Sequence, residues 1–175
     1  MTDYVGKQLG QYRVLRLMGQ GGFSKVYLGE HIYLKTPAAI KVLHTQLAGN
    51  DQEGFLNEAR IIASLEHPYI VRVLDYGVEE NGIPFLVMDH APNGTLRKYH
   101  RVGTPLPPLT ILPYVKQVAT ALQYAHGKKL IHRDVKPENM LLGPDKEVLL
   151  SDFGIAMIAH TSYQGIQDVV GTVVY

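Results

Sequence analysis

The sequence contains no cysteine, which excludes disulfide bonds and thiolate-held metal sites and fits a reducing compartment. It has no apolar run long enough to cross a bilayer. Residues 1–7 lack the basic and then apolar pattern of a secretory signal peptide. The formal net charge is +1, so no basic field favours nucleic acid or an anionic membrane as a partner. We therefore expect a cytoplasmic chain without a membrane segment, with an anchor beyond residue 175 left open.

The eight histidines are scattered, and none pairs with another at metal-ligand spacing. The chain has 175 residues, and 46% of them are hydrophobic, which is ordinary for a globular protein. This length predicts about one domain with its own buried core.

The most specific pattern is the run H-R-D-V-K-P-E-N at residues 132–139, followed by D-F-G at 152–154. A carboxylate such as Asp134 can accept a proton, and the oxygens of Asn139 and Asp152 suit a hard divalent cation. Short charged loops also arise merely as solvated turns. The order and spacing of the two motifs favour the chemical reading over that alternative.

The residues between the two motifs predict a β-hairpin. Segments 140–142 and 148–150 are apolar and β-prone, and residues 143–146 have the composition of a turn. Such a hairpin would bring Asn139 and Asp152 side by side. Two residues that bind the same metal–triphosphate complex must lie close together in this way.

The two motifs resemble those of the eukaryotic-like Ser/Thr protein kinases, in particular the bacterial branch. The resemblance implies an α+β fold of two lobes: an antiparallel-sheet lobe with one helix, and a mainly helical lobe. It makes Asp134 the base, Lys136 a contact of the γ-phosphate, and Asn139 and Asp152 the Mg²⁺ ligands. The Ser/Thr preference rests on K-P-E-N at 136–139, because tyrosine kinases carry a different run there.

A glycine-rich segment lies between two predicted strands, one around Tyr12–Leu17 and one at 26–28. Glycine lets backbone N–H groups approach phosphate oxygens without an intervening Cβ. A plain glycine hairpin is the alternative. The resemblance implies that this loop binds nucleotide, although the third family glycine is replaced by a serine. The implied nucleotide contacts are Gly19, Gln20, Gly21, Gly22, Phe23, Ser24 and Val26.

Segment 38–43 predicts a strand in which Ala39 and Lys41 share one face. The resemblance places Ala39 against adenine and Lys41 on the α/β-phosphates. Residues 51–66 have helical apolar spacing, and the resemblance makes Glu58 on this helix the partner of Lys41. The alternatives are a strand-edge lysine that prevents aggregation and a solvated helix glutamate.

Segments 70–77 and 84–88 predict two strands joined by a turn at 79–82, followed by an extended linker at 89–94. By resemblance, this linker is the hinge between the lobes. Met88 would lie behind adenine, and backbone groups of Asp89 and Ala91 would bind it. Leu141 is assigned to the same nucleotide site.

Residues 95–99 predict a short helix, and residues 109–126 predict a long one ended by Gly127. Segment 155–175 resembles an activation segment, in which phosphate on a hydroxyl could order the loop through Arg133. The hydroxyl residues considered for this role are Thr161, Ser162, Tyr163 and Thr172.

The family's A-P-E motif does not occur before Tyr175. We therefore expect residues 1–8 to be a tail, 9–88 a small lobe, 89–94 the hinge and 95–175 part of the large lobe. A large lobe without its remaining helices predicts marginal stability or exposed apolar surface on helix 109–126.

Together these patterns predict a protein Ser/Thr kinase that uses ATP and Mg²⁺, or Mn²⁺ in its place. Its partners would be proteins with Ser/Thr acceptors, with a dimer as one route to autophosphorylation. The alternatives are a nucleotide-binding pseudokinase and an inactive fragment. The residues of the catalytic set argue against a pseudokinase because all are present: Lys41, Glu58, Asp134, Asn139 and Asp152.

Overall fold

A computed structural model of the chain describes residues 3–44, 46–47, 49–100 and 103–153. These residues form two compact units. The sheet unit comprises residues 3–64 and 72–90, and the helical unit comprises residues 65–71 and 91–153. Within the described residues, no helix is both long enough and apolar enough to cross a membrane.

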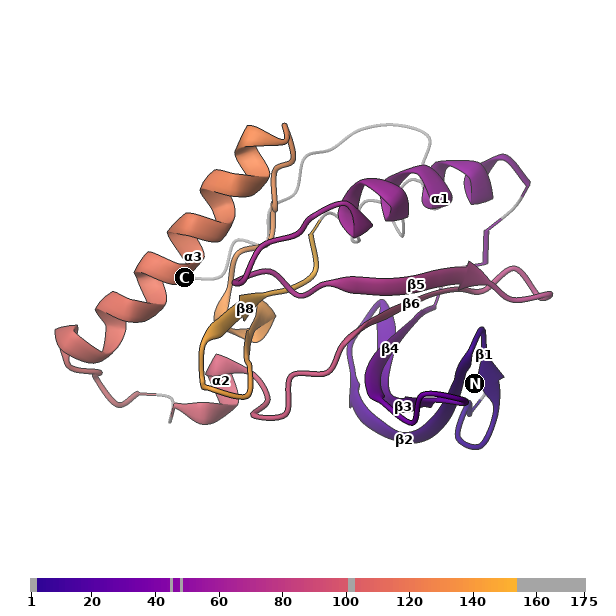
Figure 1. The fold of residues 1–175 in the computed structure, drawn as a ribbon, viewed down its shortest axis with the longest axis horizontal. Helices are drawn as coiled ribbons and strands as arrows, with labels where there is room; N and C mark the ends of the chain where they lie inside the picture. The colour runs from indigo at the N-terminus through magenta and orange to yellow at the C-terminus, as the bar shows by residue number, and fades with distance from the viewer. Residues whose placement is uncertain (1–2, 45, 48, 101–102, 154–175) are drawn as a thin grey trace. The chain divides into compact units, whose positions relative to one another are not determined.

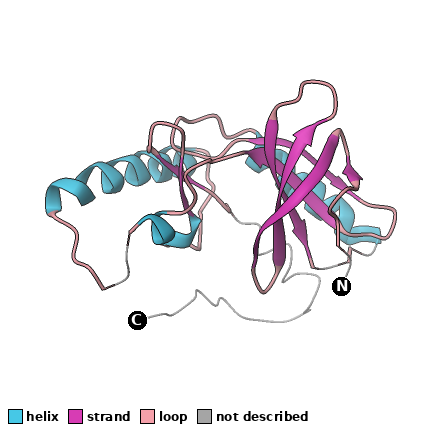
Figure 2. Cartoon of the chain, turned by 90° about the horizontal axis from the view of Figure 1, so that it is seen from below, coloured by secondary structure: helices cyan, strands magenta, loops and turns pink. Residues whose placement is uncertain are grey.

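The sheet unit is built on a six-stranded sheet in which every neighbouring pair is antiparallel. The strands are β1 (Gln8–Leu9), β2 (Tyr12–Gln20), β3 (Ser24–His31), β4 (Pro37–Leu43), β5 (Val73–Val78) and β6 (Pro84–Asp89). The strand order is β1-β2-β3-β4-β6-β5, and Figure 2 shows the strong twist of these strands.

One face of this sheet carries the core of the unit. Along β4, Ala38, Ile40 and Val42 are buried in one hydrophobic cluster, so Ala39 and Lys41 lie on the opposite face. The segment predicted as a tail contributes Tyr4 to the same core. The buried members of the cluster are Tyr4, Leu9, Tyr12, Val14, Tyr27, Ala38, Ile40, Val42, Phe85 and Val87.

Helix α1 (Gly49–Ala63) packs along β5, as Figure 1 shows. Its buried residues Phe55, Ala59 and Ile62 recur at helical spacing, as the sequence predicts. The predicted end at residue 66 is wrong, because the helix stops at Ala63. The hydroxyl of Ser64 donates to the carbonyl of Ile61, which is local bonding that competes with helix continuation.

The predicted strand 70–77 is divided in the structure. Ile70 forms a parallel bridge with Leu150, and the backbone of Leu150 bonds to Tyr69 and Val71. Because these backbone groups are already paired within the helical unit, the β5 ladder begins only at Val73. The predicted turn at 79–82 and the return strand are confirmed.

The helical unit contains α2 (Leu96–Tyr99), α3 (Pro108–Gly127), the short 3₁₀ helix η1 (Pro137–Asn139) and the hairpin β7–β8. Strands β7 (Met140–Leu142) and β8 (Val148–Leu150) pair antiparallel, as the sequence predicts. The hairpin packs on α3, where Leu142 and Val148 are buried with Val118.

Helix α3 ends at Gly127, its last helical residue, within one residue of the predicted end. The left-handed position belongs to Lys129, with φ of 60°. The Leu130 N–H donates to the Ala125 carbonyl and the Lys129 N–H to the His126 carbonyl, the two bonds of a Schellman motif. The predicted end of the helix is therefore confirmed, but Gly127 does not form the left-handed cap, because Lys129 occupies the position where glycine would be unstrained.

Several apolar side chains of α3 are exposed: Leu109 at 85%, Leu112 at 64%, Val115 at 55% and Ile111 at 40%. The expectation of exposed apolar surface on this helix is confirmed.

Candidate active site

The predicted nucleotide contacts of the sheet unit share one sheet face. Val26 on β3 lies opposite Lys41 on β4, and Ala39 lies opposite Met88 on β6. Directly opposed residues of antiparallel strands project from the same face. Since the core cluster occupies the other face, the register places these four side chains together on the face away from that core.

The glycine loop between β2 and β3 is open where side chains would otherwise project. A Cβ built at Gly19 or Gly22 would meet nothing within 4 Å, and one at Gly21 would meet only the Ser24 carbonyl oxygen at 3.8 Å. None of these glycines has a positive φ, so turn geometry does not demand them. What they provide is unobstructed backbone, which favours the phosphate-binding interpretation over a plain hairpin.

Ser24, which replaces the third family glycine, begins β3 with an ordinary backbone conformation. Its carbonyl accepts a hydrogen bond from the Gly21 N–H at 2.8 Å, which closes the tip of the loop. Serine therefore causes no backbone strain here. Phe23 at the tip is 61% exposed.

Lys41 and Glu58, the predicted ion-pair partners, both belong to the sheet unit. Lys41 is half-buried in β4 between Val26 and Leu86 of the neighbouring strands. Glu58 is half-buried on α1, one residue before the fully buried Ala59. Their roles in nucleotide binding remain predictions.

At the end of β6, Asp89 is held by Arg72. The Asp89 N–H donates to the Arg72 carbonyl at 3.0 Å, and the Arg72 Nε lies 3.3 Å from the Asp89 carboxylate. Sequence reasoning did not anticipate this pair, because the two residues lie on different segments. Ala91, the other predicted adenine contact, is half-buried in the helical unit.

In the helical unit, His132 anchors the loop that carries Asp134. The ring is 1% exposed, and its centroid lies 4.5 Å from that of Phe153. Nε2 lies 2.7 Å from the Ser151 carbonyl oxygen, and Nδ1 accepts from the Asp134 N–H at 3.2 Å. Because a carbonyl only accepts and an amide N–H only donates, these partners select the neutral Nε2–H tautomer. Burial lowers the pKa of His132, against the opposite effect of the Ser151 carbonyl.

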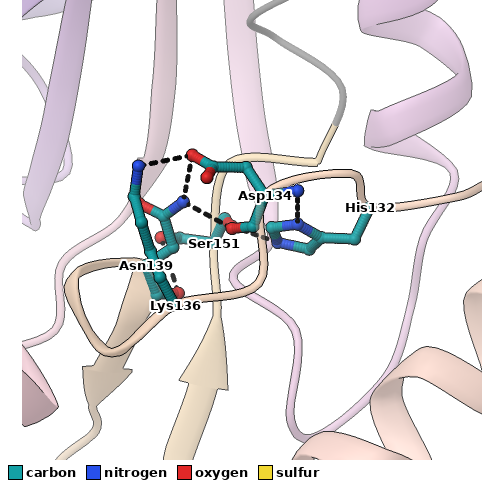
Figure 3. Close-up of polar contacts among 5 residues, drawn as sticks. All are labelled: His132, Asp134, Lys136, Asn139 and Ser151. Carbon is teal, nitrogen blue, oxygen red and sulfur yellow. Dashed lines mark hydrogen bonds and ion pairs between the residues drawn. The ribbon is translucent and has the colours of Figure 1, made fainter. Parts of the chain in front are cut away.

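The Asp134 carboxylate accepts two hydrogen bonds through Oδ2, as Figure 3 shows. The Asn139 Nδ2 donates to it at 2.9 Å and also to the Asp134 backbone carbonyl at 2.8 Å. The Lys136 Nζ lies 2.7 Å from the same oxygen. Burial raises the pKa of Asp134, but the bonds from Lys136 and Asn139 outweigh it and hold the pKa below its ordinary value. Asp134 is therefore an ionised acceptor at neutral pH.

The β7–β8 hairpin fixes the spacing between Asn139 and Asp152. The Ser151 N–H and hydroxyl both donate to the Asn139 carbonyl, at 2.9 and 3.1 Å. Asn139 is buried, and Asp152, the next residue after Ser151, is half-buried with a left-handed φ of 67°. Local strain of this kind is often found at functional sites. Leu141 on β7, predicted to line the nucleotide site, is half-buried.

The donor set fits a divalent cation that binds oxygen. The Asn139 amide nitrogen is committed to Asp134, which turns the amide oxygen the other way. That oxygen and the Asp152 carboxylate are hard ligands of the kind that Mg²⁺ prefers. The described residues contain no cluster of three or more acidic or histidine ligands, so a metal here would need further oxygens from water or phosphate.

Two features of this loop were missed by sequence reasoning. Arg97 on α2 pairs with Glu138 on η1, at 2.8 Å from Nε to Oε1. Arg133, just before Asp134, has a left-handed φ of 68°. No sequence motif marks either the Arg97–Glu138 ion pair or the left-handed conformation of Arg133. The predicted phosphorylation sites Thr161, Ser162, Tyr163 and Thr172 lie outside the described residues.

The sequence model of the protein kinase domain matches residues 12–175. The chain is 38% identical over 176 residues to the serine/threonine-protein kinase PrkC of Bacillus subtilis, covering 98% of this chain and 27% of PrkC. It is 40% identical over 175 residues to the serine/threonine-protein kinase pkn2 of Myxococcus xanthus, covering 95% of this chain and 21% of that relative.

Among solved structures, the Mycobacterium tuberculosis PknI kinase domain superimposes with a TM-score of 0.78 at 33% identity. That match covers 89% of this chain and 64% of the PknI chain. The chain thus spans well under half the length of the curated relatives named here. The family match extends over nearly all of this sequence and includes both the glycine loop and the Asp134 loop, so the chain belongs to the protein kinase domain family.

Proposed function

We propose that the protein transfers the γ-phosphoryl group of ATP to serine or threonine hydroxyls of protein substrates, with Mg²⁺ as the metal and Mn²⁺ able to replace it. The observation that carries this proposal is the Asp134 carboxylate, held by Asn139 and Lys136 on a loop anchored by buried His132. The family's general use of ATP and a divalent metal supports it.

Asp134 would accept the hydrogen bond of the substrate hydroxyl and take its proton. Its lowered pKa makes it a weak base, so it would orient the hydroxyl first and receive the proton late in the transfer. Lys136, 2.7 Å from Asp134 Oδ2, carries a positive charge that can instead meet the transferred phosphoryl group as negative charge develops.

Asn139 and Asp152 would hold the metal. When bound, Mg²⁺ neutralises phosphate charge in the transition state. The bonds from Ser151 to the Asn139 carbonyl fix the separation of the two ligand-bearing residues before any metal arrives. This preorganisation is the contribution of the chain itself.

The nucleotide would bind on the sheet face described above. Ala39 and Val26 offer apolar contacts for adenine, Met88 lies next to Ala39, and Lys41 would reach the phosphates. We assign Asp89, Ala91 and Leu141 to the adenine site and Glu58 to the positioning of Lys41. The glycine loop would supply backbone N–H groups to the phosphates.

The serine/threonine preference is supported by the K-P-E-N run at 136–139 and by the similarity to the serine/threonine-protein kinases named above. In this proposal, residues 9–88 are the small lobe, 89–94 the hinge and 95–175 part of the large lobe. Two copies meeting transiently would allow one to phosphorylate the other.

The test is Asp134→Asn in the protein as its gene encodes it, assayed for ³²P transfer from ATP to a protein acceptor and for ATP affinity by calorimetry. We expect transfer to fall by at least about 10³-fold while ATP affinity changes little, because Asp134 acts on the hydroxyl. Asp145→Asn, an exposed change in the β7–β8 turn, is the matched control and should leave both values unchanged.

Retained turnover in Asp134→Asn would contradict the role given to this carboxylate. A wild-type protein that binds ATP without transferring phosphate would instead show a pseudokinase.

A further inference from the structure

The end of β4 is attached to the tip of the glycine loop through His44. The His44 N–H donates to the Phe23 carbonyl at 2.9 Å, which extends the β3–β4 ladder by one residue past Ser24 and Leu43. The His44 Nδ1 lies 3.0 Å from the Gly22 carbonyl oxygen. Because that oxygen can only accept, Nδ1 must carry a hydrogen and donate it. One exposed histidine thus holds two successive carbonyls of the loop.

These two bonds determine where the loop amides point. In a trans peptide the N–H is directed opposite to the C=O. The Gly22 carbonyl shares its peptide with the Phe23 N–H, and the Phe23 carbonyl shares its peptide with the Ser24 N–H. With both carbonyls on His44, the N–H groups of Phe23 and Ser24 are turned to the side away from His44. Successive N–H groups directed to one side form an anion-binding surface.

We propose that His44 is a positioning residue that sets the glycine loop for nucleotide phosphate through its Nδ1–H bond to the Gly22 carbonyl. The inference rests on the proposed ATP binding. It adds a residue outside the motifs that identify the nucleotide site. The positions of the loop glycines are open where a Cβ would lie, so side-chain packing at these positions does not fix the peptide planes, and a contact from outside the loop can do so. His44 provides that contact by a side chain as well as a backbone bond.

The side-chain bond can be removed and restored selectively. His44→Ala deletes the donor. His44→Asn places its amide nitrogen near the position of Nδ1 and can keep the bond, whereas the longer side chain of glutamine places its amide nitrogen near Nε2, so His44→Gln cannot. His31→Ala is the matched control, because His31 accepts bonds from Tyr33 and Leu34 at the opposite end of β3.

The first measurement is steady-state phosphoryl transfer with ATP for these four variants. We expect His44→Ala and His44→Gln to raise the KM for ATP about threefold to tenfold, the worth of one hydrogen bond, with kcat within about twofold. His44→Asn should stay within about twofold of wild type, and so should His31→Ala. Unchanged KM in His44→Ala would overturn the proposal. An equal loss in His44→Asn would also overturn it, because the ring rather than the Nδ1–H bond would then matter.

The second measurement needs neither ATP nor turnover, so it separates failure of this inference from failure of the proposed function. Amide hydrogen exchange at Gly21 and at position 44, whose N–H groups close the loop, should accelerate about threefold to tenfold relative to each residue's intrinsic rate in His44→Ala and not in His44→Asn. If wild type transfers no phosphate and this exchange pattern still appears, the proposed function fails and the attachment by His44 stands. Exchange rates that do not respond to His44→Ala would overturn the attachment itself.

Discussion

Replacing His132 with phenylalanine separates the two contributions of this buried ring. Phenylalanine keeps the stacking on Phe153, whose ring centroid lies 4.5 Å away, but it cannot bond to Ser151 or Asp134. A buried carbonyl left without a donor costs about 1–3 kcal/mol, and the half-exposed Asp134 N–H costs less. We expect His132→Phe to lower the free energy of unfolding by about 2–4 kcal/mol near pH 7.5, measured by urea denaturation.

His132→Phe should also change how the free energy of unfolding depends on pH. Burial lowers the pKa of His132 below its ordinary 6.5, so the unfolded chain binds a proton more readily than the folded one. The free energy of unfolding of the wild type should therefore fall as pH decreases below about 6.5, and His132→Phe should lose this component. His126→Phe, at an exposed position on α3, is the control and should change neither value. A destabilisation under about 1 kcal/mol, with an unchanged pH profile, would refute the bonding described for His132.

Three further changes test local contacts inside each unit. Lys129→Gly should raise the free energy of unfolding by about 1 kcal/mol in urea denaturation, because glycine adopts the left-handed φ of 60° without strain; a lower stability would contradict this. Tyr4→Phe should lower the free energy of unfolding by about 1 kcal/mol because it loses the 2.8 Å hydrogen bond to Glu79. Burial and Glu79 raise the pKa of Tyr4 to about 12, so wild-type stability should decline above pH 10 as the unfolded tyrosine ionises, and the late phase of an ultraviolet titration should contain one tyrosine fewer in Tyr4→Phe. Gly29→Ala should lower the free energy of unfolding by about 1–3 kcal/mol because its Cβ would clash with Ile40. Adding Ile40→Val should recover part of this stability, and purely additive losses in the double variant would contradict the predicted clash.

Sequence reasoning predicted the elements that carry strong local signals. The hairpin at 140–150 and the alternation along β4 follow from apolar patterning and turn residues, and both are confirmed. The motif residues Asp134 and Asn139 lie together because they occupy one short loop, whose length alone limits their separation.

The errors arise where contacts between residues distant in sequence determine the boundary of an element. Nothing in the local pattern of residues 70–77 shows that Ile70 is paired with Leu150, so the predicted strand was too long. The end of α3 was predicted within one residue, but the left-handed cap lies at Lys129 and not at Gly127, which carries the stronger propensity signal.

The contacts that position the site were the least predictable. The bond from His132 to the Ser151 carbonyl joins segments that only the folded hairpin brings together. The bond from His44 to Gly22 joins a strand end to a loop tip that precedes it by twenty-two residues. A histidine at either position has no distinguishing spacing, so only the structure shows its partner.

The measurement that tests the central claim most directly is identification of the phosphorylated side chain. The protein and a mixed protein acceptor would be incubated with γ-labelled ATP and Mg²⁺, and the products would be mapped by mass spectrometry beside Asp134→Asn. The proposed role of Asp134 and the K-P-E-N run at 136–139 predict phosphate on serine and threonine in the wild-type reaction and at least about a 10³-fold loss in the variant. Phosphate appearing equally in both reactions, or in neither, would contradict the proposal that this chain is a protein serine/threonine kinase that uses Asp134.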